Sequence, residues 1–112
     1  ITSVDKEGTG EGYDIELITK VTSLVSIPVI AHGGAGKIDH VVNLFKQSNV
    51  NSAMISSLFH YHFIKQNTSI VSDTEGNSGF LNQKRSFHTF ETCQINELKK
   101  ELIDNQVECR LI

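Results

Sequence analysis

The chain has little of what marks secreted, membrane-spanning or nucleic-acid-binding proteins. It has two cysteines in 112 residues, a net charge of −3 with both signs mixed along the chain, and no long apolar run. These features argue against a membrane-spanning segment and against a basic surface that binds anionic membranes or nucleic acids. Because no signal peptide precedes them, Cys93 and Cys109 are expected to be two reduced thiols in a cytoplasmic protein. Residue 1 is Ile rather than Met, which suits a fragment as well as a processed chain.

The composition is that of an ordinary globular protein. Hydrophobic residues make up 38% of the chain and charged residues 21%, which lie near the globular average. A chain of this length buries one modest core and no more.

Short apolar segments alternate with segments of helical periodicity over the first half of the chain. Strands are expected at 1–4, 29–31 and 52–57, and helices at 14–24 and 38–47. Strand 29–31 is wholly apolar, as in a parallel sheet buried on both faces. This alternation predicts an α/β fold with parallel strands and helical crossovers. It leaves open whether the sheet is an open doubly wound one or a closed barrel.

The alternation of strands and helices stops after the third strand. Aromatic residues at 59–63 are expected to pack near the sheet's closing edge, and residues 65–92 form a probable insertion. Its polar part, 66–79, has no helical or strand period, so we expect it to be mobile. Apolar residues then predict a final helix from Ile95 to Ile103.

The loop that follows the second strand is the strongest local signal for a binding site. Gly33 and Gly34 stand between an apolar strand and a helix that begins near Lys37. Glycines there let backbone N–H groups approach an anion, and a side chain at position 34 would keep it away. A tight turn that needs glycine only for its dihedral angles explains the same residues equally well.

Other polar residues are predicted at the same edge of the sheet. Ser56 and Ser57 would end the next strand and complete a phosphate cup, although serines there also suit a layer of small residues. His32 directly precedes the glycines, where it would contact an anion or only form structural hydrogen bonds. Thr2, Asp5 and Glu7 belong to the first strand and its loop, where the two carboxylates could do acid/base or orienting work, although such residues are more often solvated loop charges. His60 and His62 have no third partner at a suitable spacing, so no metal site is predicted.

Taken together, these motifs resemble a known family. The segments are Asp5 to Thr9, Gly12-Tyr13-Asp14, Pro28 to Ala31, Gly33 to Lys37 with His40, Ser57 to His60, Glu97 to Lys99 and Arg110-Leu111. In combination they resemble the cyclase subunit of imidazole glycerol phosphate synthase, over residues 1–63 and about 94–111. The resemblance implies a (β/α)8 TIM barrel, of which this chain would be the C-terminal portion with strands six to eight.

The same resemblance implies which residues bind substrate. Gly33, Gly34 and Ser57 would hold one phosphate of a phosphorylated small molecule, with Thr2 and Gly8 nearby. Glu7 falls where the family usually has Asp. The family's two catalytic aspartates lie on strands one and five, so this chain would contain no catalytic residue and be inactive alone. No cofactor is expected.

The resemblance further implies that the whole protein is an enzyme of histidine biosynthesis. Its barrel would use ammonia from a glutamine amidotransferase partner to form imidazole glycerol phosphate. The family usually has Ser at position 32, and His32 together with the insertion suggests a paralogue that acts on a nucleotide-sugar in surface-polysaccharide synthesis. A third alternative is a non-catalytic phosphate-binding half barrel.

Overall fold

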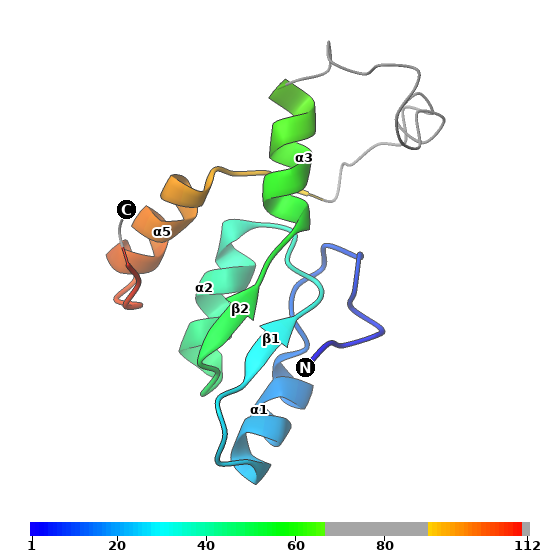
Figure 1. The fold of residues 1–112 in the computed structure, drawn as a ribbon, viewed down its shortest axis with the longest axis vertical. Coiled ribbons are helices and arrows are strands. Elements are labelled where there is room, and N and C mark those ends of the chain that lie inside the picture. Colours follow the sequence, from blue (N-terminus) through cyan, green and yellow to red (C-terminus); the bar gives the residue numbers. More distant parts are fainter. Residues whose placement is uncertain (67–89, 111–112) are drawn as a thin grey trace.

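The computed structural model describes residues 1–66 and 90–110. The predicted insertion therefore lies outside the described residues except at its two ends, and so does almost all of the segment expected to be mobile. Figure 1 shows the elements in chain order: α1 (Ile15–Leu24), β1 (Ile30–His32), α2 (Ile38–Gln47), β2 (Ser52–Met54), α3 (Ser57–Gln66) and α5 (Ile95–Asp104).

The strands are parallel, as the alternating pattern predicted. β1 pairs with β2 in a register that places Ala31 opposite Ala53. On the other edge of β1, Thr2 forms a parallel bridge with His32. The expected first strand is thus reduced to one bridge, but its position and direction are confirmed.

The helices form where the sequence supplies caps and apolar stripes. The Asp14 carboxylate accepts a hydrogen bond from the Leu17 N–H at 3.0 Å and caps α1, and Ile18 is buried beneath that helix. Helix α2 buries Val41 and Leu44 completely. Both predicted helices are confirmed to within about one residue.

The final helix packs back on the first half of the chain. In α5 the Gln94 N–H donates to the Glu97 carboxylate at 2.7 Å, which completes a capping box. Leu98 and Leu102 are buried, and α5 contacts α2. The predicted helix is confirmed, and its packing brings residues on both sides of the undescribed segment into one core.

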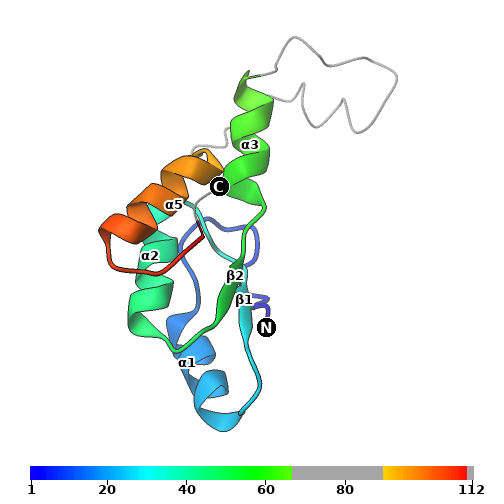
Figure 2. The same ribbon diagram turned by 60° about the vertical axis from the view of Figure 1, so that its left-hand side comes forward.

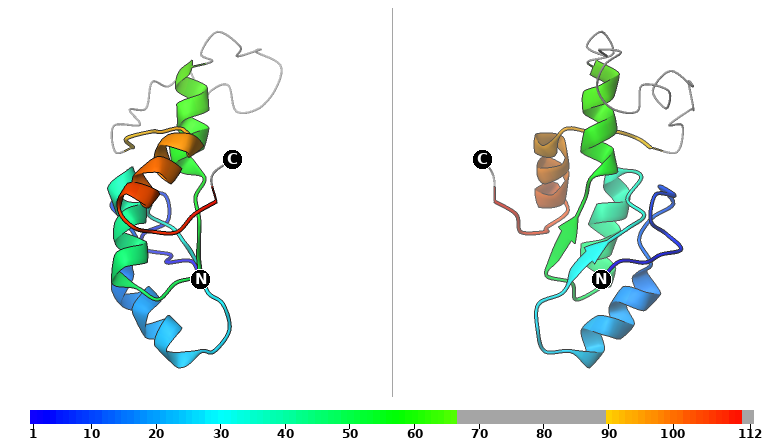
Figure 3. Two further views of the ribbon diagram at one scale, coloured as in Figure 1. Left: turned by 90° about the vertical axis from the view of Figure 1, so that its left-hand side faces the viewer. Right: turned by 45° about the vertical axis from the view of Figure 1, so that its right-hand side comes forward.

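Helices α1, α2 and α5 lie on one side of the two strands, and Figure 3 shows the other side uncovered. Ala31 is fully buried beneath the helices, whereas Ile30 is 49% and Met54 56% exposed. The expectation that the strand at 29–31 is buried on both faces is therefore wrong for this chain. The reason is that no described element covers the second face.

The strand predicted at 52–57 is shorter than expected. β2 ends at Met54, and Ser57 begins helix α3. Figure 2 shows α3 running on from β2 beyond the end of the sheet. Leu58 is fully buried and Phe63 is 64% exposed, and the aromatic stretch 59–63 lies within helix α3 and not at an edge of the sheet. In the described ranges no helix has both the length and the apolar character to cross a membrane.

Candidate functional site

A cavity of about 340 Å³ opens at the carboxyl ends of β1 and β2. Three segments line it: the first glycine-rich loop, the loop between β1 and α2, and the turn from β2 into α3. Its lining residues are Glu7, Gly8, Gly10, His32, Gly33, Gly34, Ala35, Met54, Ile55, Ser56, Ser57 and Phe90. All residues predicted to bind phosphate except Thr2 are thus brought together around one cavity.

The glycine pair forms one wall, and both residues adopt backbone angles that glycine favours. Gly33 has a φ of 98° and Gly34 a φ of 101°. The Gly34 carbonyl accepts a hydrogen bond from the Gly12 N–H at 2.7 Å. A Cβ atom at position 34 would overlap the Gly12 carbonyl. Glycine at position 34 is therefore required by the contact between two loops, whatever the cavity binds.

This contact changes the explanation for glycine at position 34. A side chain there would break the loop packing before it could block an anion, so the tight-turn interpretation accounts for Gly34 by itself. The register that pairs His32 with Met54 engages the Gly33 N–H in the sheet, whereas the Gly34 N–H donates to no acceptor in the part of the chain that the structure describes. The Gly34 N–H is therefore available to a ligand in the cavity that this residue lines.

The opposite wall is the N-terminus of α3, which was predicted as the end of a strand. The Ser56 carbonyl accepts from the N–H groups of Phe59 and His60, at 3.2 and 3.0 Å. The N–H groups of Ser57 and Leu58 precede these bonds and donate to no acceptor within residues 1–66 and 90–110. The partial positive charge of a helix N-terminus therefore lies at the cavity, beside the two serines.

Among the described residues, the first loop supplies the only carboxylate that lines the cavity, that of Glu7. The Glu7 N–H donates to the Ser3 carbonyl at 3.0 Å, which fixes the backbone of the turn. Gly8 lies beside it with a φ of 75° and open space around its α-carbon. Lys6 points to Glu11, whose carboxylate lies 3.4 Å from its Nζ atom, and is not among the lining residues. No lysine or arginine of the described ranges lines the cavity.

Thr2 lies next to the cavity but does not line it. Its Oγ1 atom is 3.2 Å from Nδ1 of His32, and His32 does line the cavity. Thr2 therefore contacts the site through another side chain, which the sequence by itself could not show.

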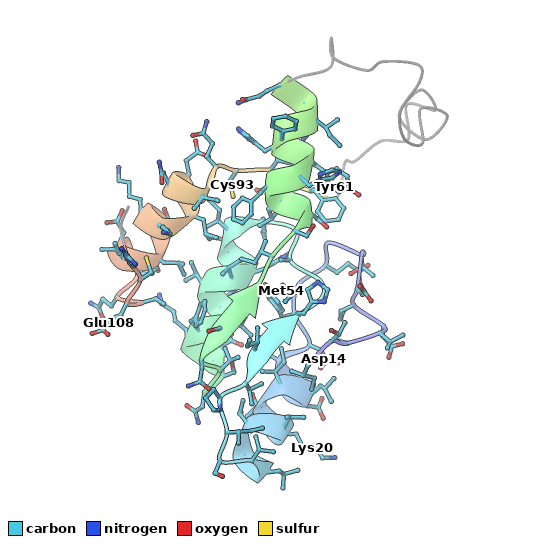
Figure 4. The ribbon with its side chains drawn as sticks, viewed as in Figure 1. Asp14, Lys20, Met54, Tyr61, Cys93 and Glu108 are labelled. Atoms are coloured by element: carbon cyan, nitrogen blue, oxygen red, sulfur yellow. The ribbon has the colours of Figure 1, made fainter. Side chains whose placement is uncertain are left out.

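Asp14, one of the two aspartates near the first loop, has a structural role. Its carboxylate caps α1 and also accepts a hydrogen bond from the Ser3 hydroxyl at 3.3 Å. Figure 4 shows Asp14 at the start of that helix.

Sequence reasoning missed the apolar part of the cavity. Phe90 is buried, and its ring centre lies 5.0 Å from that of Tyr61 on α3. The next residue, Glu91, donates its N–H to the Gly36 carbonyl at 2.8 Å. Figure 4 shows Tyr61 on α3 above Met54 of β2. The scattered phenylalanines after the third strand were the only signal, and spacing could not place Phe90 here.

Elsewhere the described residues offer no second chemical centre. They contain no group of three or more His, Cys, Asp or Glu side chains arranged to hold a metal ion. The His62 ring lies 2.8 Å from the Gln66 amide. Cys93 and Cys109 are free, and burial, followed by the Glu97 carboxylate, raises the pKa of the Cys93 thiol. This thiol is therefore held neutral and is a poor nucleophile.

Comparison with known proteins agrees with this arrangement. Residues 1–65 match the family described as "Histidine biosynthesis protein". A protein of Methanopyrus kandleri called imidazole glycerol phosphate synthase subunit HisF is 52% identical over 61 residues, which are 54% of this chain and 22% of that protein.

Two strains of Lactococcus lactis have proteins of the same name that match the chain from end to end. The identity is 31% in subspecies cremoris and 33% in subspecies lactis, over 112 residues and 32% of each relative. The chain thus spans about a third, or less, of the length of these curated relatives. Because the family match covers more than half of it, this chain belongs to the histidine biosynthesis protein family.

Proposed function

We propose that this chain is the C-terminal, phosphate-binding portion of an imidazole glycerol phosphate synthase cyclase subunit. The whole protein would be a cytoplasmic enzyme that uses ammonia from a glutamine amidotransferase partner to form imidazole glycerol phosphate. The cavity at the ends of β1 and β2 is the observation that carries this proposal, because a free N–H group of the loop after β1 and those at the start of α3 line it.

The uncovered face of the sheet supports the assignment to strands six to eight of a (β/α)8 barrel. In such a barrel, helices cover the outer face of every strand and side chains of the other strands fill the interior. Ile30 and Met54 occupy that interior position here and are half exposed. Their exposure is what a third of a barrel would show without the remaining strands.

The composition of the cavity supports a phosphate as its ligand. The N–H groups of Gly34 and Ser57 can each donate to an oxygen of a dianion, and the start of α3 adds a favourable field. Without a lysine or arginine in the described lining, binding would rest on these preorganised donors. Glu7 repels a dianion, so we place the phosphate between the glycine pair and α3, and a hydroxyl of the substrate near Glu7.

The end-to-end match with the lactococcal proteins favours histidine biosynthesis over the paralogue. These proteins carry the name imidazole glycerol phosphate synthase subunit HisF and are 31% and 33% identical to the chain over 112 residues. His32 remains the observation that favours the paralogue, because the resemblance implies Ser at this position.

The test is an activity assay on the barrel-complete protein, in which these residues follow the strands that precede them. With ammonium salts and the histidine-pathway intermediate it should form imidazole glycerol phosphate, and the 112-residue chain alone should not. The chain alone lacks the family's two catalytic aspartates, and no other group replaces a missing proton donor. Turnover by the isolated chain at a comparable rate would contradict the proposal. Activity on a nucleotide-sugar alone would select the paralogue.

A further inference from the structure

The contact between Thr2 and His32 is held by the backbone as well as by the side chains. The His32 N–H donates to the Ile1 carbonyl at 2.9 Å, and the Ser3 N–H donates to the His32 carbonyl at 3.3 Å. These two bonds align Thr2 with His32, so both side chains extend from the same face of the sheet. The 3.2 Å separation between Thr2 Oγ1 and His32 Nδ1 follows from this pairing.

This contact leaves one ring nitrogen free. His32 lines the cavity, its Nδ1 atom faces Thr2, and its Nε2 atom has no hydrogen-bond partner among the described residues. Nε2 is therefore the nitrogen that can meet a ligand.

The direction of the Thr2 hydrogen bond decides what Nε2 can do. If the hydroxyl donates to Nδ1, the neutral ring carries its proton on Nε2 and is a donor there. If the hydroxyl accepts from Nδ1–H, Nε2 is an acceptor. A phosphate dianion offers only acceptor oxygens, so only the first arrangement binds it.

We propose that Thr2 is a positioning residue that holds the proton of the neutral His32 ring on Nε2. The ring then donates a hydrogen bond to an oxygen of a phosphorylated small molecule in the cavity. This inference rests on the proposed phosphate site. It adds one hydrogen-bond donor to that site, the ring of His32, which stands where the resemblance implies Ser. Glu7 is the other titratable group that lines the cavity in the described ranges.

The experiment uses the barrel-complete protein, inorganic phosphate as the probe, and ¹⁵N NMR of the imidazole. In the free wild-type protein the neutral His32 ring should show the Nε2–H tautomer. Thr2→Val removes the hydroxyl at nearly constant volume and should shift the ring toward the other tautomer. Phosphate should then bind roughly threefold to tenfold more weakly, the range expected for one neutral hydrogen bond.

Three further variants separate this role from a general effect on folding. Thr2→Ser restores the hydroxyl and should restore both the tautomer and the affinity. Thr22→Val makes the same change on the exposed side of α1 and should alter neither. His32→Gln keeps a donor near the Nε2 position, and in that background Thr2→Val should no longer weaken binding.

The outcomes distinguish this inference from the function on which it rests. An Nδ1–H tautomer in the free wild-type protein overturns the inference without any variant. So does wild-type phosphate affinity in a folded Thr2→Val protein. If the wild-type protein binds phosphate away from His32, or not at all, the proposed phosphate site fails, whatever tautomer the ring adopts.

Discussion

The Nδ1 atom of His40 accepts a hydrogen bond from the backbone N–H of Gly36 at 3.1 Å. His40 belongs to α2, whereas Gly36 belongs to the loop that forms one wall of the cavity. The same ring lies beside the first loop, 3.6 Å from where a Cβ atom at Gly12 would stand. One histidine side chain thus holds two glycine loops in place, and its protonation state matters to both.

The first prediction concerns acid sensitivity. Burial, followed by the nearby Lys37 charge, lowers the pKa of His40 below its ordinary 6.5, and Asp39 and Glu91 only partly oppose this. Because the folded pKa lies below the unfolded one, the contribution of His40 is fully present above about pH 6.5. It should decrease as the pH falls below that value toward the folded pKa.

Urea unfolding of the barrel-complete protein across this window measures the effect. His40→Asn keeps an acceptor near the Nδ1 position but does not titrate, so this variant should lose part of the pH dependence. Equal slopes for the two proteins would show that the His40–Gly36 bond is not coupled to protonation.

The second prediction compares two glycines. A Cβ atom at Gly36 would overlap the carbonyl of Gly10, whereas one at Gly8 would meet nothing within 4 Å. Gly36→Ala should therefore cost about 3 kcal/mol or more through backbone overlap. Gly8→Ala should cost only about 1 kcal/mol, because its positive φ is the sole obstacle. Thermal melting of both variants tests the order, and a reversed order would mean that the two loops do not meet as described.

The third prediction concerns Ser57 at the start of α3. Ser57→Ala should weaken phosphate binding by roughly 1.5–3 kcal/mol, the contribution of one hydrogen bond to a charged group. Ser23→Ala, on the exposed side of α1, is the matched control and should leave binding unchanged. Phosphate titration followed by NMR gives both affinities. Chemical-shift changes that avoid residues 33, 34 and 57 would show that the glycine loop is only a turn.

The fourth prediction tests the uncovered face of the sheet. Ile30 is half exposed in this chain but would face the interior of a complete barrel. Ile30→Lys should change the stability of the isolated chain by less than about 0.5 kcal/mol. In the barrel-complete protein it should cost several kcal/mol, because it buries an unpaired charge.

Ala31→Lys is the control for the fourth prediction. Ala31 is fully buried against the helices, so its replacement should be severe in both forms of the protein. If Ile30→Lys were harmless in both forms, the barrel assignment would be wrong. Open sheet edges should also make the isolated chain self-associate, which size-exclusion chromatography would show.

Several features of the protein could be read from the sequence because their causes are local. The helical spacing of apolar residues placed α1, α2 and α5. The glycine pair after β1 marked the wall of the cavity, and the motifs identified the family. Caps, periodicity and glycine turns act over a few residues, so they leave a readable pattern.

Other features were decided only by contacts between distant residues. Spacing could not show that Ser57 begins a helix whose N-terminus faces the cavity, nor that Phe90 returns to line it. Nor could it show that Gly36 is required by the Gly10 carbonyl, or that Thr2 reaches the site through His32. Most of these relations join residues more than twenty positions apart, so they depend on how loops and helices pack in three dimensions. The early end of the third strand likewise depends on its tertiary surroundings, which override local strand propensity.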